Sequence, residues 1–186
     1  MDTIESPLPQ LDGGWFLTDA GLETVLTFQE GVALPEFAAF VLLQSTDGRE
    51  HLRRYFRRFL DLAAQTHDVG FVLESPTWRA GFDWGVKLGF DGRAMQRINR
   101  DAISLMQELK AEYAARIAKP IVISGCIGPR GDGYVAGAPM GLEDPERVHQ
   151  PQVDALAAAG ADLISAITMT SSAEAIGVAR AAARAG

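Results

Sequence analysis

The chain has 186 residues, of which 47% are hydrophobic and 22% are charged, and its formal net charge is −7. This composition is typical of a folded globular protein, and the length suits a single domain over residues 1–186. A negative net charge opposes non-specific binding to nucleic acid and to anionic lipid, since both depend on a basic surface. We therefore expect no nucleic-acid partner and no membrane partner.

Two features of the sequence indicate the compartment. Cys126 is the only cysteine, so an intrachain disulfide is impossible and nothing suggests an oxidising environment. Residues 1–10 are acidic and contain proline, unlike a secretory signal, and no stretch approaches the roughly 20 apolar residues of a membrane-spanning helix. The predicted location is the cytoplasm.

After an irregular lead-in over residues 1–14, short apolar runs alternate with segments of helical periodicity. The apolar runs predict buried strands at residues 15–18, 71–73, 121–124 and 162–167. The periodic segments predict helices at residues 36–43, 47–67, 93–117, 145–159 and 172–186, with Thr46 or Asp47 capping the second and Ser172 the last. Strands that are apolar throughout and separated by helices predict a parallel sheet covered by helices.

The helix at residues 47–67 has two chemically distinct faces. Its arginines are Arg49, Arg53, Arg54, Arg57 and Arg58, and its apolar stripe is Leu52, Tyr55, Phe56, Phe59, Leu60 and Ala63. The arginines form either a solvated helix face, which we favour, or a binding patch.

The four strand-then-helix units are about half of a closed (β/α)8 barrel. Neither the GxGxxG nor the GxxxxGK[ST] pattern follows the first strand, which argues against a doubly wound nucleotide-binding sheet. The chemically unusual loops all follow strand ends, at residues 19–24, 74–79, 125–134 and 168–171. Barrel enzymes place their active sites at this edge.

Carboxylates follow the first two predicted strands. Asp19 and Glu23 either position or deprotonate a substrate group, or simply cap and solubilise a turn. Glu74 directly follows a buried strand, so it is either a ligand-binding group or the ion-pair partner of Arg79 or Arg130.

The glycine-rich loop at residues 125–141 favours a functional role, because glycine permits close backbone approach to a ligand. Cys126 is better explained as a small apolar side chain than as a nucleophile or metal ligand. The histidines His51, His67 and His149 have no recognised metal spacing, and His149 is expected to be structural.

Five segments, TDAGLETVL, LPEFAAFVLL, LESPTWRAG, SGCIGPRGDGY and DLISAITM, together resemble the N-terminal half of the homocysteine S-methyltransferase family, in order and spacing. Asp19-Ala20-Gly21 with Thr24 resembles the family's DGG-x-x-T turn. Thr77-Trp78-Arg79-Ala80 is similar to its T-Y-Q-A segment, and Cys126-Ile127-Gly128-Pro129 resembles its S-I-G-P loop.

The resemblance implies a (β/α)8 barrel that transfers a methyl group from a sulfonium or ammonium donor to the thiol of homocysteine, a step of methionine biosynthesis. It also implies zinc, which converts a bound thiol into a thiolate. The predicted substrate-binding residues are Asp19, Ala20, Gly21, Glu74, Thr77, Cys126, Gly128 and Thr168. Two departures bear on the substrate: Ala20 replaces the first glycine of DGG, and Ile167 stands where many members have a glutamate before Thr168.

The zinc-binding cysteines of the family lie in the second half of its barrel, so the resemblance predicts no metal site within residues 1–186 and a chain truncated before the metal-binding half. Two hypotheses follow. The chain is part of a methyltransferase that needs the other half for activity, or it is a non-catalytic half-barrel that dimerises through open strand edges or binds a small ligand.

Overall fold

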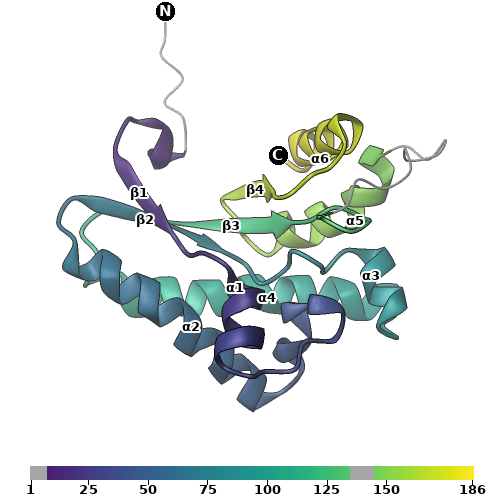
Figure 1. Ribbon diagram of the computed structural model, residues 1–186. Helices are drawn as coiled ribbons and strands as arrows, with labels where there is room; N and C mark the ends of the chain where they lie inside the picture. The colour runs from purple at the N-terminus through teal and green to yellow at the C-terminus, as the bar shows by residue number, and fades with distance from the viewer. Residues whose placement is uncertain (1–7, 135–144) are drawn as a thin grey trace, which may run out of the picture.

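The computed structural model describes residues 8–134 and 145–186, and its centre is one parallel sheet of four strands (Figure 1). The strands are β1 (Trp15–Thr18), β2 (Val69–Glu74), β3 (Ile121–Ile127) and β4 (Leu163–Ala166), in the spatial order β1-β2-β3-β4. Every neighbouring pair is parallel. The predicted α/β half-barrel is therefore confirmed.

Helices follow each strand, as expected for (β/α) units. The longer ones are α2 (Thr46–Gln65), α4 (Gly92–Tyr113), α5 (Pro145–Ala158) and α6 (Ser172–Ala185), with shorter α1 (Leu22–Thr24) and α3 (Phe82–Lys87). Single turns lie at η1 (Pro9–Leu11), η2 (Val25–Gln29), η3 (Pro35–Phe37) and η4 (Ala39–Gln44). Pro151 lies within α5, which continues through it.

The structure corrects several local predictions. The helix expected at residues 36–43 is two 3-10 turns, because Glu36 has φ +53° and interrupts helical geometry. Ser45, rather than Thr46 or Asp47, caps α2 by accepting a hydrogen bond from the Gly48 amide at 3.0 Å. The sequence pattern does not predict α3, because six residues are too few to show a clear period.

A second correction concerns the third strand. β3 extends to Ile127, so Gly125 and Cys126 are strand residues and not part of the glycine-rich loop. The extension is fixed by β4, whose register pairs Cys126 with Ser165 and Ile127 with Ala166. Part of the loop predicted at residues 125–141 lies outside the described residues.

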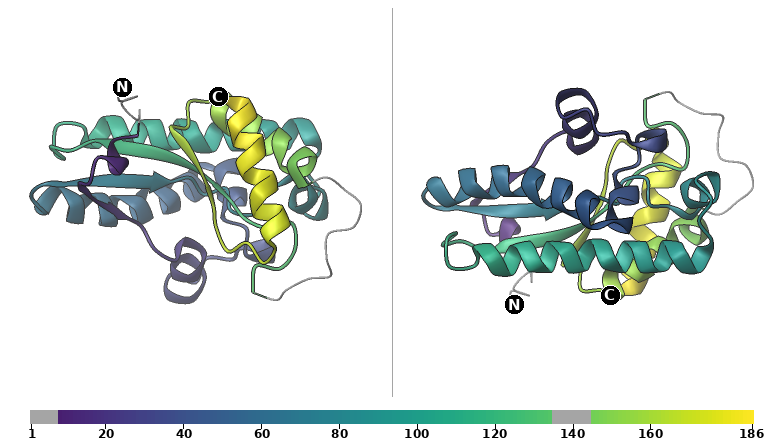
Figure 2. Two further views of the ribbon diagram at one scale, coloured as in Figure 1. Left: turned by 90° about the horizontal axis from the view of Figure 1, so that it is seen from above. Right: turned by 90° about the horizontal axis from the view of Figure 1, so that it is seen from below.

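The main core lies between the sheet and helices α2 and α4, which run side by side beneath it (Figures 1 and 2). Tyr55, Phe56 and Leu60 of α2 are completely buried, and so are Phe71 and Leu73 of β2. Burying each such side chain contributes about 1.5–3 kcal/mol. The apolar stripe predicted from helical spacing is therefore the inner face of α2.

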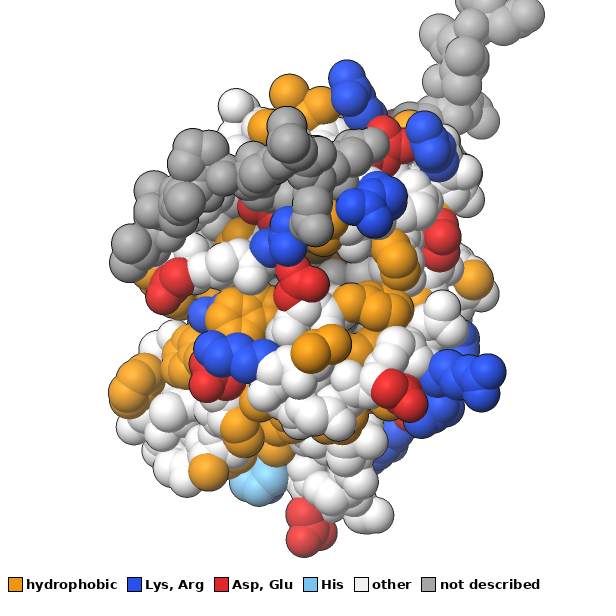
Figure 3. Space-filling model, turned by 90° about the vertical axis from the view of Figure 1, so that its right-hand side faces the viewer, with side chains coloured by type: hydrophobic (Ala, Val, Ile, Leu, Met, Phe, Trp, Pro, Cys, Tyr) orange, Lys and Arg blue, Asp and Glu red, His pale blue; other side chains and the backbone are white. Residues whose placement is uncertain are grey.

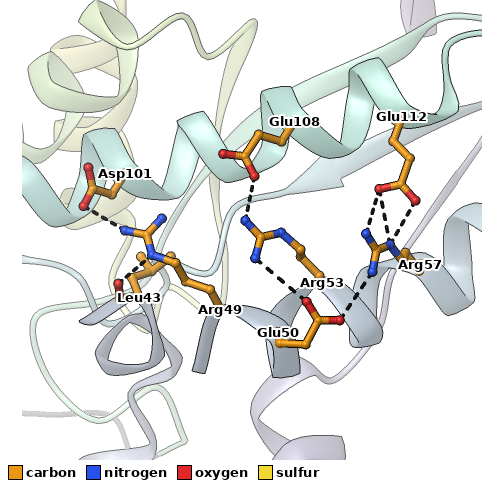
Figure 4. A network of polar contacts seen from close by, with 8 residues as sticks. All are labelled: Leu43, Arg49, Glu50, Arg53, Arg57, Asp101, Glu108 and Glu112. Atoms are coloured by element: carbon orange, nitrogen blue, oxygen red, sulfur yellow. Dashed lines mark hydrogen bonds and ion pairs between the residues drawn. The ribbon is translucent and has the colours of Figure 1, made fainter. Parts of the chain in front are cut away.

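Figure 4 shows three arginines of α2 that form ion pairs with acidic residues of α4. The pairs with α4 are Arg49–Asp101 at 3.0 Å, Arg53–Glu108 at 2.7 Å and Arg57–Glu112 at 3.0 Å. Arg54 and Arg58 both contact Glu30. These contacts favour the helix-face explanation over a binding patch, because the positive charges are already matched.

The outer strands each have one edge without a neighbour in the sheet. β1 and β4 end the strand order, and Trp15 of β1 is 81% exposed. Such edges leave backbone donors and acceptors available for pairing. Within the described ranges, no helix has both the length and the apolar composition needed to span a membrane.

Candidate functional site

A cavity of about 360 Å³ opens at the carboxyl ends of the strands. All four strands contribute to its lining: Asp19 follows β1, Glu74 ends β2, Cys126 lies in β3 and Thr168 follows β4. Apolar side chains complete the walls, namely Leu22, Phe37, Trp78, Tyr134 and Ile167. Figure 3 views the molecule from the side toward which β3 points, where hydrophobic side chains lie among acidic and basic ones.

The turn after β1 places two carboxylates in this cavity. Gly21 has φ +69°, a left-handed conformation that glycine adopts without strain, and α1 begins directly after it. Leu22 then packs into the core while Glu23 lines the cavity. The Tyr55 hydroxyl donates a hydrogen bond of 2.9 Å to Asp19 Oδ2, which fixes that carboxylate from beneath.

Burial raises the pKa of every carboxyl group in the cavity. Desolvation raises the pKa of Asp19 to about 6, with the Tyr55 hydrogen bond opposing the rise and the Glu74 charge adding to it. Desolvation raises the pKa of Glu23 to about 7, with Asp19 adding to the rise and Arg79 opposing it. Groups perturbed in this way near pH 7 are typical of functional sites, because they bind cations or exchange protons readily.

Glu74 lies among hydroxyl groups where it lines the cavity. Burial raises its pKa, and hydrogen bonds from Ser124, Ser165 and Cys126 oppose the rise. The two serine hydroxyls are 2.7 Å apart, and Glu74 Oε2 is buried without a hydrogen-bond partner. The Cys126 pKa is raised by its own burial and by Glu74, so the thiol stays protonated and is a poor nucleophile.

Neither of the arginines proposed as partners of Glu74 forms an ion pair with it in the described structure. Arg130 Nε contacts Asp83 Oδ2 at 2.6 Å. Arg79 is instead clamped between two tryptophans, with its guanidinium carbon 4.4 Å from the Trp78 ring centre and 3.8 Å from that of Trp84. This outcome favours the ligand-binding alternative for Glu74.

Trp78 is fixed against the later strands. Its indole N–H donates to Thr168 Oγ1 at 3.0 Å, and its carbonyl accepts from the Gly128 amide at 2.8 Å. A Cβ at Gly128 would come within 2.5 Å of Trp78, so only glycine fits there. The loops after β2, β3 and β4 are therefore held together around one indole ring.

Five of the eight predicted site residues line the cavity: Asp19, Gly21, Glu74, Cys126 and Thr168. The other three do not. Ala20 is exposed, Gly128 packs behind Trp78, and Thr77 is completely buried with its hydroxyl donating to the Cys126 carbonyl at 2.7 Å.

The sequence-based list omits several residues that form the walls. These residues are Glu23, Phe37, Trp78 and Tyr134. The signal for Glu23 is its position in the turn after a strand. Aromatic residues carry no comparable signal, because the same residue types also fill cores.

His149 is a structural residue, as expected. It is 4% exposed, and its Nε2 lies 2.9 Å from Glu174 Oε1, which also accepts from the Arg130 amide at 2.8 Å. This pair joins α5, α6 and the loop after β3, outside the cavity.

The family resemblance implies zinc, so the described side chains were tested as ligands. No group of three or more His, Cys, Asp or Glu residues within residues 8–134 and 145–186 is arranged to hold a metal ion. These residues do not fit a zinc site, and we derive no step through a metal.

The fold and cavity define a class: (β/α)-barrel proteins with a small-molecule site at the carboxyl edge of a parallel sheet. The model of the homocysteine S-methyltransferase family matches residues 16–185. The chain therefore belongs to that family.

Two solved structures resemble the chain, and both are of the homocysteine methyltransferase MmuM from Escherichia coli. The oxidized form has a TM-score of 0.74 at 19% identity over 95% of this chain, and the metallated form has 0.72 at 22% identity over 95%. At these identities the likeness shows the fold. The chain spans only 60% and 62% of the two solved chains. No curated protein sequence matches it.

Proposed function

We propose that the chain forms the substrate-binding part of a methyltransferase site that moves a methyl group from a sulfonium or ammonium donor to a thiol such as homocysteine. The cavity carries this proposal: in a chain of the homocysteine S-methyltransferase family, Asp19, Glu74 and Thr168 converge on one hollow at the carboxyl ends of parallel strands. We further propose that catalysis needs a second half-barrel. This chain covers only 60% and 62% of the two solved methyltransferase chains, which supports that part of the proposal.

The side chains of this chain suit binding and shielding. Trp78 and Tyr134 form an edge-to-face pair with ring centres 6.2 Å apart at the cavity wall. Aromatic faces attract the positive charge of an onium group, by about 0.5–2 kcal/mol according to burial. The carboxylates Asp19 and Glu74 add favourable negative potential.

After the thiol has lost its proton to solvent, the thiolate sulfur forms a bond to the methyl carbon as the carbon–sulfur or carbon–nitrogen bond of the donor breaks. The donor group leaves as a neutral sulfide or tertiary amine, so the charges of thiolate and onium both disappear. An apolar wall that excludes water favours such a reaction. The thiolate and the onium group are then poorly solvated before they react, so they have less solvation free energy to lose when their charges cancel. Trp78, which is 8% exposed, supplies the buried part of this wall, and the more exposed Tyr134 and Ile167 form its rim. Glu74 and Asp19 hold the polar end of the ligand.

The test is a methyl-transfer assay on the 186-residue chain, with L-homocysteine as acceptor. The donors are one dimethylsulfonium and one trimethylammonium compound, each with an isotopically labelled methyl group. The assay is run with and without zinc and with and without a separately expressed second half of a family barrel. Label in methionine only with the second half present supports the proposal. If none of these conditions yields labelled methionine, the proposal is contradicted.

A second candidate function rests on the open edges of the sheet. β1 and β4 both lack an outer neighbour, and Trp15 is 81% exposed. A non-catalytic half-barrel that dimerises through these edges has the same features. Light scattering after size-exclusion chromatography distinguishes the two, since a dimer that binds no homocysteine favours this candidate.

A further inference from the structure

We propose that Glu23 is the binding subsite for the ammonium group of an amino-acid ligand in this cavity. The inference rests on the proposed function only in taking the ligand to be an amino-acid thiol. It assigns a role to a side chain that the family-like turn does not mark, since the turn's resemblance rests on Asp19, Gly21 and Thr24.

The first argument is position. Glu23 lies in α1, immediately after the left-handed Gly21, and its side chain lines the cavity together with Asp19. Leu22 beside it is 7% exposed and packs inward, so it anchors the turn to the core. The Glu23 carboxylate is therefore held at the cavity wall by a short, anchored helix.

The second argument is the lack of a partner. Among the described residues, no side chain donates a hydrogen bond to Glu23; only its own backbone amide does. Arg79 acts on it through charge alone and is held between two tryptophan rings. The Glu23 carboxylate is partly exposed and partly desolvated, and a cationic ligand offsets the cost of that desolvation.

The third argument is the number of acceptors. Asp19 Oδ1 is buried without a hydrogen-bond partner, and the charge of Asp19 raises the pKa of Glu23. A primary ammonium has three N–H donors and suits a pair of acceptors. A sulfonium or quaternary ammonium group has no N–H donor. The pair of carboxylates therefore favours the amino group of the thiol acceptor over the methyl donor.

Binding of an ammonium group should also displace protons. The groups acting on Glu23 are Asp19, Arg79, the Tyr55 hydroxyl and the Cys126 thiol, with Glu74 acting through Asp19. Only Arg79 is cationic, so a ligand ammonium adds the missing positive charge. Glu23 then ionises more readily, and at pH 6.5 the complex releases a fraction of a proton.

The experiment compares ligands that differ only in the amino group, by calorimetric titration of the 186-residue chain at pH 6.5. L-norvaline and pentanoate form one pair and carry a methyl group in place of the thiol, and L-homocysteine and 4-mercaptobutanoate form the thiol pair. The protein variants are Glu23→Gln and the matched control Glu36→Gln. Glu36 pairs with Lys87 at 2.6 Å and does not line the cavity.

We expect L-norvaline to bind more tightly than pentanoate, and Glu23→Gln to weaken L-norvaline about tenfold to a hundredfold while leaving pentanoate unchanged. Repeating the titration in buffers of different ionisation enthalpy should show proton release with L-norvaline, and less with Glu23→Gln. Glu36→Gln should behave as the parent. The proposal is overturned if neither ligand binds, if both bind equally, or if Glu23→Gln discriminates as the parent does.

These outcomes separate the subsite from the methyl-transfer proposal. Selective L-norvaline binding without any methylation of homocysteine leaves the ammonium subsite standing and removes the proposed function. If homocysteine is methylated but Glu23→Gln does not change amino-group selectivity, the proposed function stands and the ammonium subsite is overturned.

Discussion

The stability of this protein should depend on pH through Glu23, and in an unusual direction. Burial raises the pKa of this carboxyl from an ordinary value of 4.5 to about 7 in the folded state. A folded-state pKa above the unfolded one means that the native protein binds the proton more tightly, so the stability contribution is full below pH 4.5 and is lost as pH rises through 7. A shift of this size corresponds to at most about 3.5 kcal/mol, at about 1.4 kcal/mol per pKa unit.

The variant Glu23→Gln mimics the protonated carboxyl at every pH. We therefore expect it to match the parent near pH 4.5 and to become more stable as pH rises, by up to about 3 kcal/mol at pH 8. Urea unfolding followed by tryptophan fluorescence at pH 5, 6, 7 and 8 measures the difference. As control, Glu108→Gln removes an exposed ion pair with Arg53 and should cost less than about 1 kcal/mol.

A Glu23→Gln protein that is no more stable than the parent at pH 8 would refute this reasoning. So would a difference that stays constant between pH 5 and pH 8. Either result would mean that the carboxylate is adequately solvated or paired in the native state, which would also weaken the ammonium subsite proposed above.

Three further predictions test the surroundings of the cavity. Tyr55→Phe removes the hydrogen bond to Asp19, which should raise the Asp19 pKa by about one unit, measured by carboxyl ¹³C NMR titration. Gly128→Ala should displace Trp78 and destabilise the fold by about 1–3 kcal/mol, with a shift in tryptophan emission. Arg57→Ala should lower stability by less than about 1 kcal/mol, because its ion pairs with α4 are exposed, and added salt should shrink the effect.

The elements that the sequence predicts correctly are those with a strong local period. The apolar residues of α4 that recur at spacings of three and four are all buried: Met95, Ile98, Ala102, Leu105, Met106, Leu109 and Tyr113. Local failures occur where tertiary contacts decide. β3 reaches Ile127 because β4 pairs with it, and η3 breaks because Glu36 adopts positive φ.

The candidate site divides in the same way. Asp19 and Glu74 were predictable, because parallel strands bring their carboxyl ends to one edge. Thr77 illustrates the limit. It is one residue from Trp78 and two from Ser75, which both line the cavity, yet it is completely buried and bonds the Cys126 carbonyl. Which of Ser75, Thr77 and Trp78 faces the cavity depends on loop geometry that the sequence pattern does not encode.

Polar groups beneath the cavity are hydrogen-bonded, whereas some carboxylate oxygens that line it are not, and this contrast supports a binding role. Beneath the cavity, polar groups are matched: the Ser75 hydroxyl lies 2.6 Å from Thr77 Oγ1 and accepts the Cys126 amide at 3.0 Å, which locks β2 to β3. In the walls, Asp19 Oδ1 and Glu74 Oε2 are buried and unmatched. Proteins tolerate such a local cost where a ligand completes the hydrogen bonding. A rigid base under unsatisfied carboxylates is therefore the arrangement expected of a preformed site for a small cationic molecule.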